Sequence, residues 1–144
     1  MTKLITISAI LFTCLFIFQV SGAEAQSEPT PLTKAVYLTK EGDYELAIEY
    51  CNQAIDNNPK NADAYYLRGF ARYNMNNYEA AIKDFDTTVS INNHHADAYL
   101  YRGNCKKELN KYWSALRDYR KAKDIAPSIT NMYMIKNLVS ALFS

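Results

Sequence analysis

The chain has 144 residues, of which 49% are hydrophobic and 22% charged, and its formal net charge is +1. This composition is typical of a folded globular protein and excludes a disordered chain. A net charge this close to zero provides no overall field that would attract nucleic acid or an anionic membrane surface. Only 4 Gly and 4 Pro interrupt the sequence, and this scarcity of helix breakers favours a helical protein.

The first 25 residues differ from the rest. Lys3 precedes an almost wholly apolar run from Leu4 to Val20, and Ala23 and Ala25 form a small-x-small cleavage pattern. These features predict a hydrophobic signal helix over residues 1–25 that is cleaved, so that the mature protein is exported and is periplasmic or secreted. Two alternatives remain open. The uncleaved run is long enough to anchor the chain in a membrane, and Cys14 is a candidate for lipid attachment.

Start and stop signals divide residues 26–144 into helices joined by short turns. Thr30 and Pro31 are residue types preferred at an N-cap and at the first helical position. Asp43 and Asn61 are suited to cap the next two helices. The pattern predicts helices over residues 31–41, 44–57, 62–75, 78–91, 96–109 and 112–125. One more amphipathic helix is predicted over residues 131–143, with no partner helix after it.

The sequence repeats itself every 34 residues. Residues 62–95 and 96–129 both begin Ala-Asp-Ala-Tyr, and residues 28–61 form a looser copy. Equivalent positions of the second helices lie on one helix face: Tyr44/Tyr78/Tyr112, Ala47/Ala81/Ala115, Cys51/Phe85/Tyr119 and Ala54/Thr88/Ala122. In the first helices one column holds Ala35, Gly69 and Gly103. Gly in a helix interior costs about 1 kcal/mol against Ala, so a neighbouring helix is expected to pack closely there.

These columns and their period resemble the tetratricopeptide repeat, in which an aromatic residue, Gly, Tyr, Ala, a large residue, Ala and Pro recur over 34 residues. The first helix departs from the pattern, with Pro31 in the aromatic place and Ala35 in the Gly place. The resemblance implies an all-α fold of seven helices behind the signal helix, arranged as an α-solenoid of three stacked helix-turn-helix repeats with a C-terminal capping helix. The repeats would be residues 28–61, 62–95 and 96–129, and the cap residues 130–144.

The family usually binds peptides or protein segments in a concave groove and is not usually catalytic. The resemblance implies a groove lined by Leu32, Val36, Asp63, Tyr66, Phe70, Tyr73, Asn74, Asp97, Leu100, Tyr101, Asn104 and Lys107. One family variant clamps a C-terminal carboxylate with Lys, Asn and Arg. The matching positions here are Leu32, Val36, Leu67, Asp97 and Tyr101. Only the Tyr101 hydroxyl is a good donor among them, so this mode of binding chaperone C-termini is not expected.

Two side-chain patterns admit both a functional and a structural reading. The aromatic stripe Tyr66, Phe70 and Tyr73 is suited to anchor a peptide, but such a stripe is also typical of packing between helices. The pairs Arg68/Asp84 and Arg102/Asp118 are each 16 residues apart in the same columns, whereas the first repeat has Lys34 and Tyr50 there. For these pairs we favour an ion pair between the two helices of a hairpin over a ligand site.

The sequence contains no recognisable catalytic set, phosphate loop or cofactor motif, so we expect neither an enzyme nor a cofactor. His94 and His95 are adjacent on a predicted turn and do not by themselves form a metal site, which needs three or four converging ligands. Cys51 and Cys105 are separated by a whole hairpin, so we expect buried thiols rather than a disulfide. The sole Trp, Trp113, falls on a second helix, away from the groove, and nucleic acid is not an expected partner.

Charge changes along the repeats. The first repeat has 3 basic and 6 acidic residues and the third has 8 basic and 4 acidic, giving −3 and +4. This gradient fits either a solvated surface or a homo-oligomer that assembles through its ends. Two hypotheses follow: an exported, non-catalytic module that holds a protein or peptide partner in the groove, or a self-associating structural or assembly protein of the cell envelope.

Overall fold

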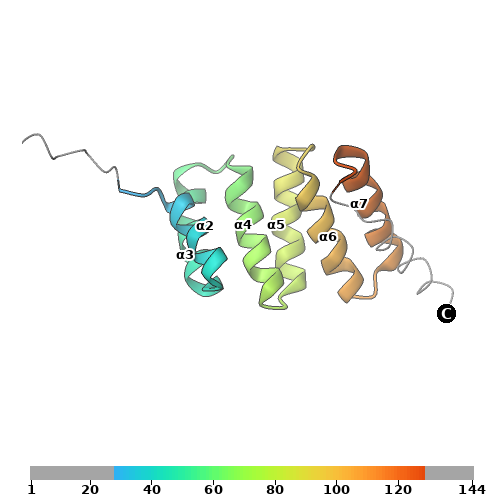
Figure 1. The fold of residues 1–144 in the computed structure, drawn as a ribbon, viewed down its shortest axis with the longest axis horizontal. Coiled ribbons are helices and arrows are strands. Elements are labelled where there is room, and N and C mark those ends of the chain that lie inside the picture. Colours follow the sequence, from blue (N-terminus) through green and yellow to red (C-terminus); the bar gives the residue numbers. More distant parts are fainter. Residues whose placement is uncertain (1–27, 129–144) are drawn as a thin grey trace, which may run out of the picture.

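The computed structural model describes residues 28–128, and six helices cover nearly all of this range (Figure 1). They are α2 (Pro31–Glu41), α3 (Tyr44–Asn57), α4 (Ala62–Asn74), α5 (Tyr78–Ile91), α6 (Ala96–Glu108) and α7 (Tyr112–Ile125). Successive helices form three antiparallel hairpins that stack side by side in chain order, and no strand occurs in residues 28–128. The predicted all-α solenoid is therefore confirmed over these residues.

The helix ends follow from local residue types. The side chains of Thr30, Asp43 and Asn61 accept hydrogen bonds from backbone N–H groups in the first turns of α2, α3 and α4, as the sequence predicted. The predicted ends of α4 and α6 were one residue too long. The chain leaves each helix toward Asn76 and Asn110, whose φ of 60° lies in the left-handed region, and Asn tolerates this conformation better than most residues.

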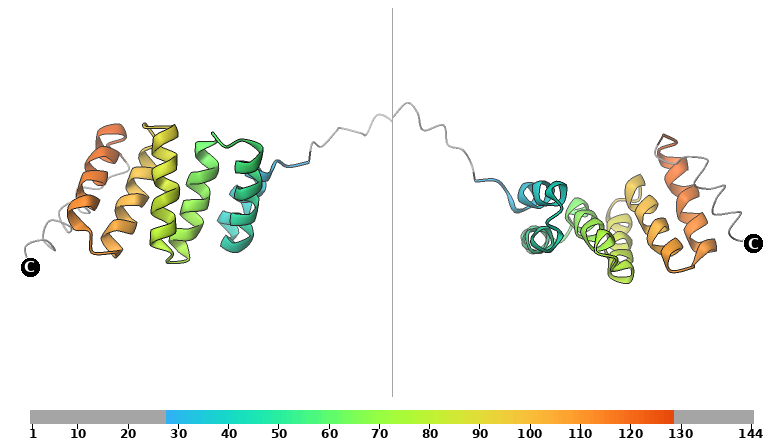
Figure 2. Two further views of the ribbon diagram at one scale, coloured as in Figure 1. Left: turned by 180° about the vertical axis from the view of Figure 1, so that it is seen from behind. Right: turned by 60° about the horizontal axis from the view of Figure 1, so that its bottom comes forward.

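Small side chains allow the helices within each hairpin to approach closely. The column residues Ala35, Ala47, Ala81 and Ala115 are fully buried. A Cβ atom added at Gly69 would lie 2.9 Å from Cε1 of Phe85, and one at Gly103 would lie 2.7 Å from Cε1 of Tyr119. The close packing inferred from the repeated Gly is thus confirmed. Seen from behind and tilted, the hairpins form a twisted row rather than a flat layer (Figure 2).

The predicted ion pairs are present, and they connect three helices rather than two. Nη2 of Arg68 lies 2.7 Å from Oδ1 of Asp84, and Nη1 of Arg72 lies 2.7 Å from the other carboxylate oxygen. Nη1 of Arg68 also donates to Oδ1 of Asn52 in the preceding hairpin, at 2.7 Å. Each Arg in this column therefore joins its own hairpin and the hairpin before it.

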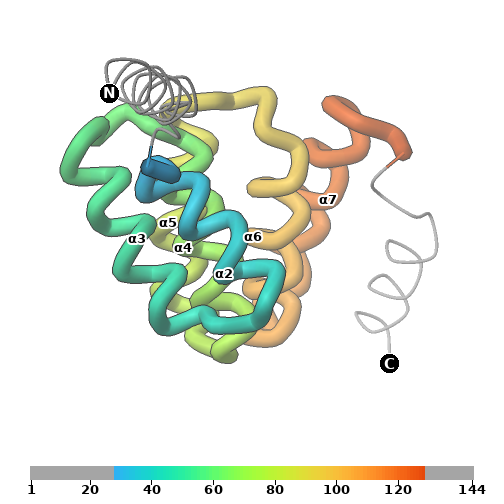
Figure 3. The backbone as a smooth tube through the Cα atoms, turned by 60° about the vertical axis from the view of Figure 1, so that its left-hand side comes forward, coloured from blue at the N-terminus to red at the C-terminus, as the bar shows by residue number. Residues whose placement is uncertain are grey.

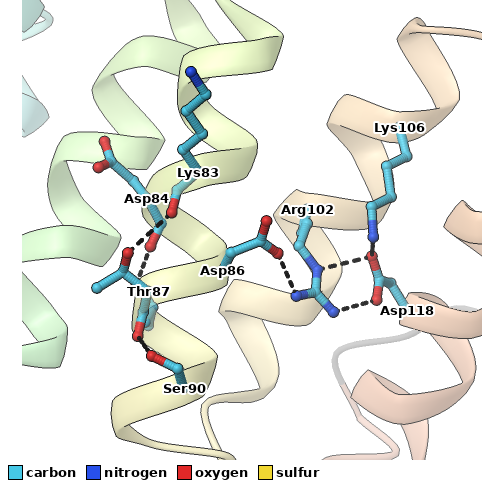
Figure 4. Close-up of polar contacts among 9 residues, drawn as sticks. Lys83, Asp84, Asp86, Thr87, Ser90, Arg102, Lys106 and Asp118 are labelled. Atoms are coloured by element: carbon cyan, nitrogen blue, oxygen red, sulfur yellow. Dashed lines mark hydrogen bonds and ion pairs between the residues drawn. The ribbon is translucent and has the colours of Figure 1, made fainter.

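The third hairpin repeats this arrangement (Figure 4). Arg102 donates to both carboxylate oxygens of Asp118 and, through Nη1, to Oδ1 of Asp86 in the preceding hairpin. Nζ of Lys106 completes the network at 2.7 Å from Oδ2 of Asp118. Asp84 and Asp118 are almost fully buried, so these networks contribute to the specific register in which the hairpins stack.

Two predicted segments lie outside the described residues: the signal helix over residues 1–25 and the capping helix over residues 130–144. Within residues 28–128, each helix is too short, or too polar, to cross a bilayer. The array that the structure describes therefore begins with α2 and ends with α7.

Candidate functional site

The inner helices α4 and α6 bring an aromatic cluster together across two hairpins. The ring of Tyr101 lies 4.9 Å from that of Phe70 and 5.4 Å from that of Tyr73, both edge-on, and 6.2 Å from that of Tyr66. Such edge-to-face geometry is the preferred arrangement for aromatic pairs. Four residues of the predicted groove therefore form one continuous surface.

This cluster has a buried floor. The ring of Phe85, which is fully buried on α5, lies 6.1 Å from the ring of Tyr66 and 6.3 Å from that of Tyr101. The four rings above it are only partly buried. Both readings of the aromatic stripe are thus partly correct: the rings hold adjacent hairpins together, and they still present an accessible apolar face. Tyr78 contacts Tyr73 from the packing side, as predicted.

His95 belongs to this cluster, and the sequence reasoning missed it. Its ring lies 4.5 Å from that of Tyr66, and its Nδ1 accepts a hydrogen bond from the backbone N–H of Ala98 at 3.2 Å. His95 is thus the N-cap of α6, equivalent to Asn61 at the start of α4. That shared column was the available signal, because a side-chain acceptor is preferred at the N-cap.

Two carboxylates lie at the edge of the cluster where α4 and α6 begin. Asp63 is well exposed, with Oδ1 3.7 Å from Nε2 of His95. Asp97 is also exposed. Burial, and then the negative charge of Asp97, raises the pKa of Tyr66 and of Tyr101 above their ordinary value. The groove is therefore aromatic with an acidic edge, and these tyrosines remain neutral at physiological pH.

The predicted groove residues at the other end of α4 and α6 are partly occupied by internal contacts. The hydroxyl of Tyr119 donates to Oδ1 of Asn104 at 2.7 Å, and Leu100 packs against the core between α6 and α7. Nζ of Lys107 lies 3.0 Å from a carboxylate oxygen of Glu108. Nδ2 of Asn74 donates to the backbone carbonyl of Phe70. These side chains support the surface more than they extend it.

The first hairpin contributes only apolar groove positions. Leu32 and Val36 on α2 are half-buried. Together with Leu67, Asp97 and Tyr101 they occupy the places that would clamp a free carboxylate. Two of these places in α2 carry no hydrogen-bond donor in their side chains, and Asp97 carries the opposite charge. The aromatic cluster is therefore the part of the predicted groove best suited to contact a ligand.

The described residues show no group of three His, Cys, Asp or Glu side chains that would hold a metal ion. Cys51 and Cys105 are both buried and unbonded, as predicted. Burial raises the pKa of each thiol to about 12, which makes the reactive thiolate scarce at neutral pH. Neither cysteine offers a nucleophile at the groove.

A comparison with family models matches the tetratricopeptide repeat over residues 33–102. The helical array of this chain is made of tetratricopeptide repeats. No significant match was found among curated proteins. The family match agrees with the 34-residue period, the column residues and the stacked hairpins, and it supports a protein-interaction module.

Several solved structures share the fold. The first TPR of Spaghetti (RPAP3), bound to the HSP90 peptide SRMEEVD, has a TM-score of 0.75 and 24% identity, covering 85% of this chain and 100% of that one. The Arabidopsis OM64 TPR domain has a TM-score of 0.72 and 27% identity, covering 75% and 90%. The second TPR domain of human RPAP3, in complex with the HSP70 peptide SGPTIEEVD, has a TM-score of 0.69 and 25% identity, covering 77% and 91%.

Proposed function

We propose that the protein is an exported, non-catalytic module that holds a peptide or protein segment in the groove formed by α2, α4 and α6. The observation that carries this proposal is the partly exposed aromatic cluster of Tyr66, Phe70, Tyr73 and Tyr101, which spans two hairpins. Partly buried aromatic anchors commonly contribute most of the binding energy at an interface. The two RPAP3 domains, which bind peptides, support the same role here.

The segment that we propose for this groove is apolar or aromatic, and it is not an acidic C-terminus. Acidic peptides such as SRMEEVD, which the first RPAP3 domain binds, would meet Asp63 and Asp97 at the edge of the cluster. Like charges at an interface lower affinity and act against the wrong partner. The apolar Leu32 and Val36 extend the surface and also favour an apolar segment.

Selection from a random peptide library tests this function. Wild-type protein is expected to enrich aromatic or aliphatic peptides, and synthetic SRMEEVD serves as the comparison peptide in fluorescence anisotropy. Phe70→Ala is expected to weaken binding of an enriched peptide by tenfold or more, with circular dichroism confirming that the helices persist. Trp113→Ala is the matched control, because Trp113 is an exposed aromatic residue on the second helix of the third hairpin. Equal loss in both variants would contradict binding in the groove.

A second candidate function is self-association through the ends of the array, as a structural or assembly protein of the cell envelope. The charge gradient favours it. On the exposed face of α7, Arg117, Arg120 and Lys121 make no ion pair with any residue in the described range. Lys106 was a predicted contact for a partner, but that prediction was wrong, since this residue is committed to Asp118. Reversing the charge of Arg117 and Lys121 is therefore the cleaner test, read as loss of oligomers in sedimentation velocity.

Export itself rests on the apolar run from Leu4 to Val20 and the small residues Ala23 and Ala25. Its test is the N-terminal sequence of the protein recovered from the expressing cell's envelope or medium. A mature chain that begins at Gln26 supports export with cleavage. An intact N-terminus in a membrane fraction supports the anchor, and lipid on Cys14 supports a lipoprotein.

A further inference from the structure

The N-terminal end of the array contains an apolar pocket that is separate from the groove. It has a volume of about 300 Å³ and is lined by α2, α3 and the residues just before them, including Pro29, Lys34, Tyr37, Leu38, Leu46 and Tyr50. Tyr37 is 62% exposed and Leu46 is 37% exposed. Viewed from this end of the molecule, α2 and α3 lie in front of the later hairpins (Figure 3). The volume is at the lower end of the range for small-ligand pockets.

The pocket exists because the first hairpin differs from the others on the face where hairpins stack. The positions of Tyr37 and Tyr50 are held by Ala71 and Asp84 in the second hairpin, and both of those residues are buried. There, the preceding hairpin covers the face and Asn52 bonds to Arg68 across the joint. The first hairpin thus carries a stacking face with large apolar side chains in place of an ion pair, and no other described helix covers it.

The chain also carries an apolar segment that lies outside the described residues, at the opposite end. Residues 129–144 contain eight large apolar side chains, one cation, Lys136, and no Asp or Glu. The predicted helix over residues 131–143 would span about 20 Å. Because α4, α5, α6 and α7 separate the two ends and neighbouring helices lie about 8–10 Å apart, this helix would not reach the pocket of its own copy.

We infer that the pocket between α2 and α3 receives the C-terminal segment, residues 129–144, of a second copy of this chain. This inference rests on the second candidate function and specifies how the ends would meet. The charges agree: Glu28, Glu45 and Glu49 are exposed beside lining residues of the pocket, whereas the C-terminal segment follows a repeat with a net charge of +4. Opposite charges steer such an encounter and fix its orientation.

This contact is heterologous, since each copy offers one pocket and one C-terminal segment. Such contacts produce open chains or closed rings rather than only symmetric dimers. Protein expressed from the full-length sequence is therefore expected to form species larger than a dimer as concentration rises, measured by sedimentation velocity. Raising the salt concentration is expected to weaken them, because exposed charges are screened.

Complementation of two variants tests the inference. Leu46→Asp damages the pocket at an exposed position, and Leu138→Asp damages the C-terminal segment. Each variant alone is expected to be monomeric with wild-type circular dichroism, at least tenfold weaker in self-association than the wild type. Mixed together, they retain one intact pocket and one intact segment, so they are expected to form a 1:1 dimer and nothing larger. Trp113→Asp, at the other end of the array, serves as the control and is expected to associate like the wild type.

The possible failures have different meanings. A wild-type protein that stays monomeric at all concentrations overturns both self-association and this contact. Oligomers that persist in Leu46→Asp, and in Tyr37→Asp as a second pocket variant, overturn the contact while self-association through another surface stands. A mixture of the two variants that remains monomeric, although the wild type associates, also overturns it. If the N-terminal residues of the same copy fill the pocket instead, Leu46→Asp will lower thermal stability without changing the oligomeric state.

Discussion

The buried carboxylate of Asp84 offers a direct test of how the hairpins are held together. Only 4% of its side chain is exposed, and it lies 2.7 Å from a guanidinium nitrogen of Arg68 and 2.7 Å from one of Arg72. Asp84→Asn keeps the shape of the side chain but leaves two like charges facing a neutral group. Removing one partner of a buried ion pair typically costs about 3–5 kcal/mol.

The lower end of that range applies here. The side chains of Arg68 and Arg72 retain 18% and 27% exposure, so both cations can partly turn toward water. We therefore expect Asp84→Asn to lower the free energy of unfolding by about 3 kcal/mol, which corresponds to a Tm roughly 12 °C lower for a domain of this size. The effect should change little with added salt, because a buried charge is poorly screened.

The assay is urea denaturation followed by circular dichroism, with Asp86→Asn as the matched control. Asp86 contacts Arg102 but is 56% exposed, and an exposed ion pair contributes only about 0–1 kcal/mol. Adding Arg72→Met to Asp84→Asn should restore part of the stability, because it removes one unpaired cation. The explanation fails if the two single variants differ by less than 1 kcal/mol, or if removing the second cation makes the protein still less stable.

Three further predictions concern packing, titration and helix capping. Gly103→Ala should destabilise the fold by about 1–3 kcal/mol in urea, despite the helix preference of Ala, because the new Cβ would lie 2.7 Å from Cε1 of Tyr119; a neutral result would contradict the close approach. Stability should fall as pH rises above about 9, since the thiols of Cys51 and Cys105 ionise near 9.0 when unfolded but near 12 when folded, and the native protein should not react with a thiol reagent at pH 8 while the urea-unfolded protein reacts at both residues. His95→Ala should cost about 1 kcal/mol through loss of the cap of α6, and His95→Asn should recover most of it; failure of Asn to do so would point to the ring contact with Tyr66 as the main contribution.

The repeating columns were enough to predict the helices and how they stack. Six helices were placed to within one residue at each end, because turns and caps are local effects of Thr30, Asp43, Asn61 and the Asn residues that end α4 and α6. The pairing of Arg68 with Asp84 was also predictable, since the two columns change together within one chain. Periodicity reports what each repeat does in the same way, and these features recur.

Features that differ between repeats needed the tertiary structure. The column pattern did not show that Tyr101 joins the aromatic stripe from the next hairpin, or that His95 stacks on Tyr66. Nor did it show that Lys106 is committed to Asp118, or that the first hairpin contains a pocket. Each depends on side chains from separate helices meeting at a joint, and a period within one chain carries no distances across that joint.

The sequence by itself determined a repeating helical array with a distinct N-terminal segment, because hydrophobic period, small residues and caps act over a few turns of helix. The tertiary structure decided which faces remain available. It showed aromatic rings that are half-buried between α4 and α6, and a stacking face on the first hairpin that no other described helix covers. Exposure is a property of the assembled hairpins, since whether a side chain meets water or a neighbour depends on how its hairpin packs against the next.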